Sequence, residues 1–207
     1  EPRERSGISR WNVESGTWTW YEPTLIPNLT STQVSVIRIE GRYVWIGTTD
    51  QGVFRYDRKN GLWKNWTIFN NLGSNRITDL ALTQDWVWIT TNYGVTRIRK
   101  ATEVAEIIPD KRLINLQVNS VRIQTDWVWL ATRTGIFRYR LSNGELDYIL
   151  PAGTGIIDGN ITAISVYENE VWFGTPSGIE MVDTKKNEWR GFPASRYFFD
   201  GNITYLL

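Results

Sequence analysis

The sequence contains neither cysteine nor histidine among its 207 residues. Without cysteine there is no disulfide, no thiol nucleophile and no thiolate metal site. Without histidine the chain lacks the commonest general base and the commonest metal ligand. No EF-hand loop and no glycine-rich phosphate-binding motif occurs either. We therefore expect no metal, no cofactor and no histidine-dependent catalysis.

Charge of one sign and long apolar runs are also missing. The chain has 23 basic and 22 acidic side chains, so no strong field is available to hold a nucleic acid. Apolar runs are only a few residues long, whereas a membrane span needs about 20, and we expect no span in this chain. The first residues, Glu1–Arg5, do not resemble a signal peptide, and there is no initiator Met. We expect a mature form or a piece of a longer protein.

Tryptophan, in contrast, is abundant, and its positions reveal a repeat. A Val-Trp strand motif, exemplified by V-W-I-G-T, starts at Val44, Val87, Val128 and Val171, at intervals of 41 to 43 residues. An array with a period of 40 to 45 residues is typical of repeat folds such as propellers. The repeat is therefore the first organising feature of the chain.

Each period contains four short apolar segments, which we name A, B, C and D. They are rich in Val, Ile, Trp and Thr and are separated by Gly, Asn and Asp, a composition typical of strands and hairpins. Segment B carries the Val-Trp motif, and segment C follows a glycine. Segment D is centred on Trp63, Val104, Leu146 and Trp189. No stretch shows a helical apolar stripe.

The repeat predicts an all-β chain, a β-propeller with four-stranded antiparallel blades of about 42 residues. We expect a single propeller domain or propeller fragment over residues 1–207. Four complete blades are predicted at 33–66, 76–108, 117–149 and 160–192, strands C and D of a partial blade at 1–21, and strand A of the next blade at 202–207. Two interpretations stay open: a window of a larger propeller, or a five-bladed ring closed imperfectly with one strand missing.

The tryptophans are expected to fill the space between blades. A buried aromatic side chain removes roughly 150–250 Å² from water, worth about 4–6 kcal/mol gross. In segment A, Ile37 and Ile39 and their equivalents share one face. The small or polar face is expected to line a central channel with Arg38, Asp79, Ser120, Arg122, Ser165 and Tyr205. This channel is either a hydrated pore or a seat for a polar ligand.

Three further groups of side chains are candidates for function. The D–A and B–C loops share one rim and offer Asp50, Asn70, Asn71, Asn92, Tyr93, Arg112, Arg133, Asp158, Arg196, Tyr197 and Asp200. Such loops suit sugar or peptide recognition, but no pair among them is spaced as an acid and a base. Arginine recurs in segment C as Arg10, Arg55, Arg97 and Arg138, and we interpret it as packing on tryptophan or pairing with an acidic neighbour rather than binding an anion.

Four Asn-x-Thr sequons begin at Asn28, Asn65, Asn160 and Asn202. As glycosylation acceptors they would imply an exported protein. The last two match the way segment A begins in this repeat, so the candidates for a glycan are Asn28 and Asn65.

The residues Leu72–Leu82, Asp85–Thr91 and Gly94-Val95, with the C segment Gly52–Asp57, carry a resemblance to a known family. They are similar to the two-component regulator propeller repeat, and the match covers nearly the whole chain. It departs at the A–B turn, which is shorter here. The resemblance implies the extracytoplasmic sensor part of hybrid histidine kinases or diguanylate cyclases, whose propellers bind a ligand or partner and perform no chemistry.

The leading hypothesis is a non-enzymatic extracytoplasmic propeller, periplasmic or on the cell surface. Its partner would be a small glycan or solute, or another protein chain at the rim or at open blade edges. One alternative is a scaffold subunit of an exposed protein assembly. Another is a carboxylate-based enzyme acting on polysaccharide, which requires two carboxylates about 5–10 Å apart in a rim cleft.

Overall fold

The computed structural model describes residues 8–21, 26–27, 29, 33–149 and 158–197. These residues form four antiparallel four-stranded sheets and one two-stranded sheet. Helix in this part of the chain is confined to a 3-10 turn at Ile68–Asn70 and the short α1 (Ala194–Tyr197). The predicted all-β propeller architecture is confirmed.

Each complete sheet is one blade with its strands in chain order. Blade 1 is β3 (Val34–Glu40), β4 (Tyr43–Thr48), β5 (Val53–Asp57) and β6 (Leu62–Trp66); blade 2 is β7 (Ile77–Leu82), β8 (Trp86–Thr91), β9 (Gly94–Arg99) and β10 (Ala105–Ile107). Blade 3 is β11 (Val118–Gln124), β12 (Trp127–Thr132), β13 (Ile136–Arg140) and β14 (Leu146–Ile149); blade 4 is β15 (Ala163–Tyr167), β16 (Glu170–Thr175), β17 (Gly178–Asp183) and β18 (Glu188–Pro193). The two-stranded sheet, β1 (Ile8–Asn12) and β2 (Thr17–Tyr21), is called the half-blade below.

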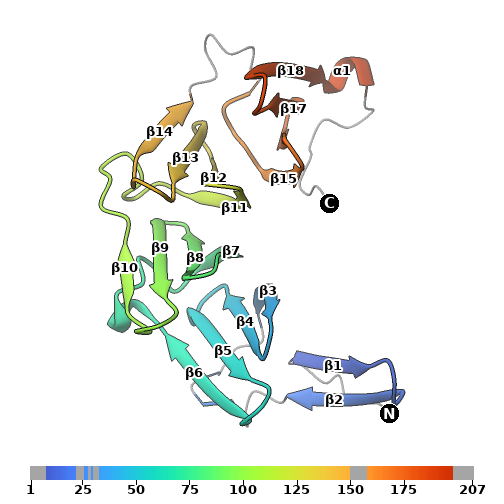
Figure 1. Cartoon of the computed structure of the whole chain (residues 1–207), viewed down its shortest axis with the longest axis vertical. Coiled ribbons are helices and arrows are strands. Elements are labelled where there is room, and N and C mark those ends of the chain that lie inside the picture. Colours follow the sequence, from blue (N-terminus) through green and yellow to red (C-terminus); the bar gives the residue numbers. More distant parts are fainter. Residues whose placement is uncertain (1–7, 22–25, 28, 30–32, 150–157, 198–207) are drawn as a thin grey trace.

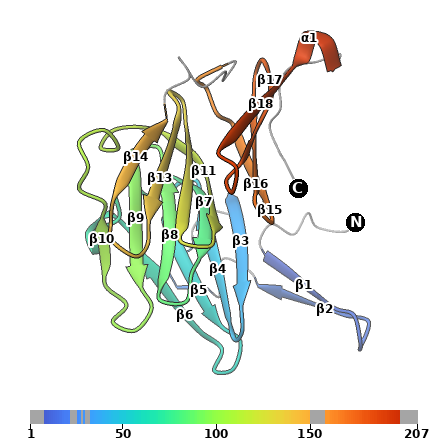
Figure 2. The ribbon, with the colours of Figure 1, turned by 45° about the horizontal axis from the view of Figure 1, so that its top comes forward.

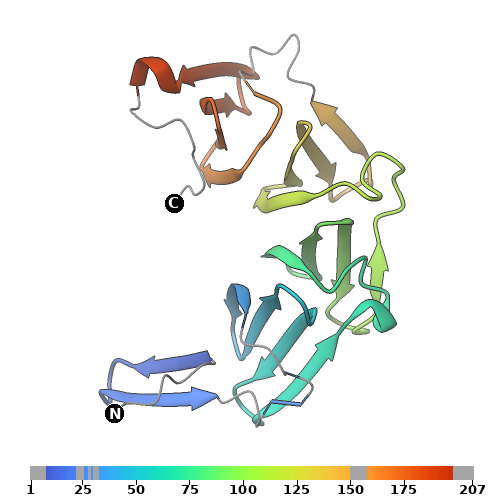
Figure 3. The ribbon, with the colours of Figure 1, turned by 180° about the vertical axis from the view of Figure 1, so that it is seen from behind.

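The blades stand side by side along an open arc, with the A strands on the concave side (Figure 1, and from behind Figure 3). Figure 2 shows the inner strands β3, β7 and β11 next to one another. The predicted strand at 202–207, with Tyr205, and the candidates Asn28, Asp200 and Asn202 lie outside the described residues.

One predicted strand centre was wrong. Segment D of blade 2 was placed on Val104, but β10 begins at Ala105, and Val104 is 57% exposed. The reason is a tight turn, in which the Val104 carbonyl accepts a hydrogen bond from the Arg99 amide and Glu103 has a φ of 59°.

Tryptophan side chains fill the spaces between consecutive blades. Trp45, Trp88 and Trp129, the segment B tryptophans of blades 1 to 3, are at most 1% exposed. Trp45 shares a hydrophobic core with Leu80 and Val87 of the next blade. The predicted role of these indoles is confirmed, and their burial supplies the apolar contact that a single sheet lacks.

The tight B–C turn requires glycine at Gly52. Its φ is +80°, and a Cβ atom there would lie 2.1 Å from the carbonyl oxygen of Trp66. The Gly52 carbonyl accepts hydrogen bonds from the Thr48 amide and side chain, which joins the ends of β4 and β5. The recurring glycine before segment C therefore reflects backbone geometry.

Candidate functional site: a polar cavity on the inner strands

The first candidate site is built by strand A of three consecutive blades. Each of β3, β7 and β11 shows a register irregularity at its start, where one residue has no partner in strand B. These residues are Ser35, Thr78 and Asn119, and all three line one cavity of about 350 Å³. Because a β-bulge redirects side chains, it places polar groups on the concave side.

Asp79 of β7 lines this cavity and contacts side chains of both neighbouring blades. Its carboxylate Oδ1 accepts hydrogen bonds from Arg38 Nη2 at 2.7 Å and from the Leu80 amide at 2.8 Å. Its Oδ2 accepts from Ser120 Oγ at 2.8 Å and Arg122 Nη1 at 2.6 Å. One buried carboxylate thus joins three blades through charge-assisted hydrogen bonds.

The two arginines are also held by backbone carbonyls. Arg38 Nε donates to the Leu80 carbonyl at 2.9 Å, and Arg122 Nη1 donates to the Val121 carbonyl at 2.7 Å. Two guanidinium groups and one carboxylate give this wall a formal charge of +1. The predicted channel residues Arg38, Asp79, Ser120 and Arg122 are therefore brought together, whereas Ser165 is not in the described lining.

Hydrogen bonds between blades fix the cavity's shape. Thr78 Oγ1 donates to the Val118 carbonyl at 2.5 Å, and Asn119 Nδ2 donates to the Ile161 carbonyl at 2.7 Å. Each bond joins one blade to the next. The lining is consequently held in one arrangement by the fold itself, the kind of preorganisation that lowers the ordering cost of binding in general.

A second cavity, of about 610 Å³, lies at the rim where the B–C turn of blade 1 meets its D–A loop. It is lined by Asp50, Gln51, Asn65, Thr67, Phe69, Asn70 and Asn75. Thr67 and Asn70 form a capping box around the 3-10 turn, which presents the Phe69 ring with 91% of its surface exposed. Phe69 is not among the residues predicted from the sequence, although the Thr67–Asn70 spacing is a capping signal.

The other predicted rim residues do not converge on that cavity. Asn92 and Tyr93 lie on the turn between β8 and β9, and Tyr93 is 53% exposed. Arg133 is exposed between β12 and β13, and Arg196 is exposed on α1, which ends at Tyr197. Of the rim candidates whose side chains the structure describes, only Asp50 and Asn70 share this cavity.

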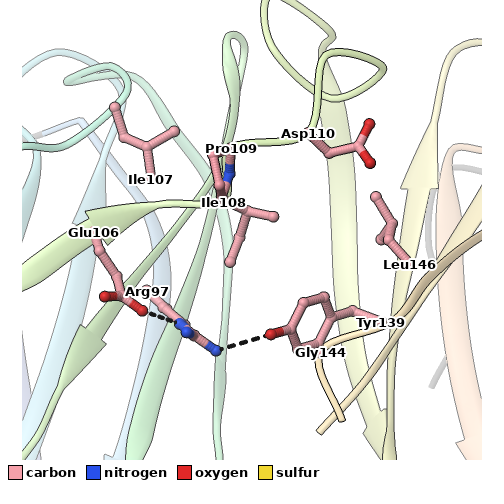
Figure 4. A pocket seen from close by; sticks show the side chains of 9 residues that line it. All are labelled: Arg97, Glu106, Ile107, Ile108, Pro109, Asp110, Tyr139, Gly144 and Leu146. Carbon is pink, nitrogen blue, oxygen red and sulfur yellow. Dashed lines mark hydrogen bonds and ion pairs between the residues drawn. The ribbon is translucent and has the colours of Figure 1, made fainter.

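A third cavity, of about 460 Å³, lies on the outer perimeter between blades 2 and 3 (Figure 4). Arg97 Nε donates to Glu106 Oε1 at 2.5 Å, and its Nη1 donates to the Tyr139 hydroxyl at 3.2 Å. Asp110 lies across the cavity and pairs with Arg112; the Arg112 hydrogen bond lowers the pKa of Asp110. Each of the two carboxylates is paired with its own arginine.

The repeated segment C arginines pack on aromatic rings, as expected. The guanidinium carbon of Arg97 lies 4.0 Å from the Trp86 ring centre, and that of Arg138 lies 4.4 Å from the Trp127 ring centre. Arg55 lies 4.6 Å from the Tyr43 ring centre and pairs with Glu103. The structural interpretation of these three residues is confirmed.

The Asn65 sequon is engaged in the fold. Asn65 Nδ2 donates to the carbonyls of Gln51 at 3.1 Å and Val53 at 3.2 Å, and Thr67 serves as the helix cap. A glycan on this nitrogen would replace a hydrogen that holds the turn. Asn65 thus has a structural role in the unmodified chain, with both hydrogen bonds donated by the nitrogen that a glycan would occupy.

Two general findings concern membranes and metals. No helix in the described part of the chain is long and apolar enough to cross a membrane. Among the described residues, no group of three or more Asp or Glu side chains is placed to hold a metal ion.

No model of a protein family and no curated protein matches the sequence. Solved structures do match. The extracellular domain of the putative one component system BT4673 from B. thetaiotaomicron has a TM-score of 0.78 at 20% identity, covering 98% of this chain and 28% of that one. That of the putative hybrid two component system BT3049 from the same organism has a TM-score of 0.70 at 13% identity, covering 91% of this chain and 28% of that one.

A third similar structure is PorZ, a surface component of the type-IX secretion system of Porphyromonas gingivalis. Its TM-score is 0.67 at 13% identity, covering 86% of this chain and 34% of that one. The chain therefore spans about a third or less of each of these structures. The neighbours agree with the resemblance to two-component regulator propellers. This chain has the β-propeller fold found in extracellular domains of two-component systems.

Proposed function

We propose that the chain is a non-enzymatic, extracytoplasmic propeller that binds a small polar ligand, a short glycan or another solute, in the inner-strand cavity. The observation that carries this proposal is the convergence of Ser35, Thr78 and Asn119 from three blades on one preorganised polar cavity. The extracellular domains among the structural neighbours support a location outside the cytoplasm.

The arrangement of carboxylates argues against hydrolysis of a polysaccharide. Asp79 in the inner cavity accepts bonds from two arginines, and Asp50 is the one carboxylate in the described lining of the rim cavity. A glycosidase needs one carboxyl group that stays protonated beside one that is ionised. Each of these two cavities has a single carboxylate in its described lining, so neither supplies the pair.

The proposal is tested by thermal unfolding with a panel of short neutral and acidic glycans and small solutes. A ligand that binds the folded state raises Tm saturably with concentration. Ser35→Trp fills the cavity without removing a described hydrogen bond, and we expect it to weaken binding at least tenfold. Phe69→Ala is the matched change at the rim cavity, and we expect it to leave binding unchanged.

Two results would overturn this assignment. If no compound in the panel raises Tm saturably, the inner cavity is a hydrated pore. If Phe69→Ala rather than Ser35→Trp weakens binding, the ligand occupies the rim instead.

A further inference from the structure

The carboxylate in the inner-strand cavity has its hydrogen-bonding capacity taken up by the fold. The oxygens of Asp79 accept five hydrogen bonds: from Arg38 and the Leu80 amide at Oδ1, and from Ser120, Arg122 and the Val121 amide at Oδ2. An ionised carboxylate has about four lone-pair sites, so these donors saturate it. The single anionic group in the described lining is therefore not available to accept a hydrogen bond from a ligand.

The two arginines of the lining differ in how many of their donors are used. Arg38 donates from all three of its nitrogens, with Nη1 bonding the Ile37 carbonyl at 3.1 Å. Arg122 donates from Nη1 alone, although that one nitrogen has three acceptors. Within the described part of the chain, Nε and Nη2 of Arg122 have no acceptor. The Arg122 side chain is 24% exposed and lines the cavity, so these donors can serve a ligand.

The hydroxyl of Ser35 is a further polar group in this lining that has no partner among the described residues. It comes from the bulge of β3, one blade before Asp79 and two before Arg122. The equivalent side chains Thr78 and Asn119 instead donate to carbonyls of the next blade. The groups left for a ligand are thus two guanidinium nitrogens and one hydroxyl, all of which can donate.

The open donors of Arg122 match a carboxylate in geometry and in charge. Nε and Nη2 lie on one edge of the guanidinium plane, and their parallel N–H bonds meet the two oxygens of a carboxylate in a bidentate pair. The two arginines and Asp79 leave the described lining with a formal charge of +1. One negative charge on the ligand neutralises this excess, whereas a neutral ligand leaves it and a cation is repelled.

We infer that the inner cavity, taken as the ligand site proposed above, selects ligands that carry a single carboxylate. The ligand carboxylate accepts from Nε and Nη2 of Arg122, and the Ser35 hydroxyl donates to another oxygen of the ligand. The cavity volume of about 350 Å³ is near the lower end of the range for small-molecule sites. It suits a single sugar acid or a smaller carboxylic acid.

The test uses two pairs of compounds that differ only in the charged group. D-Glucuronate is compared with D-glucose, and acetate with acetamide, by NMR titration of the nitrogen-15-labelled chain. We expect each acid to bind at least about tenfold more tightly than its neutral counterpart, because hydrogen bonds to charged groups are the stronger kind. The Nε–H signal of Arg122 should shift on addition of the acids alone. Whichever acid binds more tightly identifies the ligand as a sugar acid or a plain carboxylic acid.

Two variants separate the open donors from the positive charge. Arg122→Gln and Arg38→Gln each remove one cation and one ion pair of Asp79, but only the first removes donors that the fold leaves unused. We expect Arg122→Gln to weaken binding of the acids at least about tenfold and Arg38→Gln less than about threefold. Circular dichroism checks that both variants fold, and the Nε–H shift in the wild type tests the same contact without any substitution.

Four outcomes would overturn the inference. Equal affinity for glucuronate and glucose, both weakened by Ser35→Trp, would refute selection of a carboxylate while the cavity remained the ligand site. Equal losses in the two arginine variants would refute the role of the open donors. Binding of the acids that survives Ser35→Trp would place them outside the cavity. Absence of a saturable shift with all four compounds would refute selection of a carboxylate, whatever the wider panel of glycans shows.

Discussion

The carboxylate of Asp79 gives the sharpest test of how the blades are held together. Asp79→Asn keeps the size of the side chain and one acceptor oxygen but removes the charge. It leaves Arg38 and Arg122 beside each other without their shared counterion. Asp79 itself is 7% exposed, so water can replace only a small part of the lost interaction at the carboxylate.

The magnitude follows from the burial of the three partners. Breaking a fully buried ion pair by removing one partner costs about 3–5 kcal/mol. The arginine side chains are 35% and 24% exposed, so solvent screens part of this interaction, and we expect a loss of about 2–3 kcal/mol. For a chain of this size, 1 kcal/mol lowers Tm by about 2–4 °C. The expected decrease is about 4–12 °C.

The assay is urea and thermal unfolding monitored by circular dichroism, with Asp85→Asn as the control. Asp85 is exposed on the turn before β8, and the same substitution there should change the free energy of unfolding by less than about 0.5 kcal/mol. If Asp79→Asn costs no more than Asp85→Asn, the inner strands are held by apolar packing alone, and the reasoning about this carboxylate is refuted.

Three further predictions concern acid stability, turn geometry and packing. The pKa of Glu103 is lowered, mainly by the hydrogen bond from a lysine and then by an arginine, whereas desolvation opposes the shift. Ionised Glu103 therefore stabilises the folded state above about pH 4.5, and this contribution is lost as the pH falls. In urea unfolding, Glu103→Gln should flatten the dependence of stability on pH between about pH 5 and 3. Gly52→Ala should destabilise the chain far more than Gly61→Ala in the same assay, because both have positive φ but a Cβ atom has open space only at Gly61. Trp88→Ala should cost about 3–5 kcal/mol of unfolding free energy and Trp18→Ala less than about 1 kcal/mol, since Trp88 is 0% and Trp18 is 56% exposed; equal losses would contradict the role of the buried indoles.

The repeat could be predicted from the sequence because its signals are local. The Val-Trp motif, the turn glycines and the alternation of strand A each occupy a few consecutive residues, and together they define the blade. The packing of Arg97 and Arg138 on aromatic rings could also be predicted from nearby sequence, because the aromatic residues lie on the adjacent strand of the same blade. Val104 was misplaced because its turn depends on one hydrogen bond that composition does not reveal.

The candidate sites were harder to predict because their residues come from different blades. Asp79 contacts residues 41 to 43 positions away, and no single segment shows that these contacts form. The bulge residues Thr78 and Asn119 carry no distinguishing signal in the sequence, although their lack of a partner in strand B places them in the cavity. The exposure of Ile37, whose counterpart Leu80 is buried, likewise depends on how the blades stack, because the sequence patterns at the two positions are alike.

The described residues form four hydrophobic cores, one between the half-blade and blade 1 and one between each later pair of neighbouring blades; among these residues no core joins blades that are not neighbours. Such an array behaves like a row of coupled units, in which cooperativity passes only between adjacent members. A destabilising change in one blade therefore lowers the stability of the blades on either side, and its effect on more distant blades is smaller. Whole units can accordingly be gained or lost during evolution while those that remain keep their internal structure.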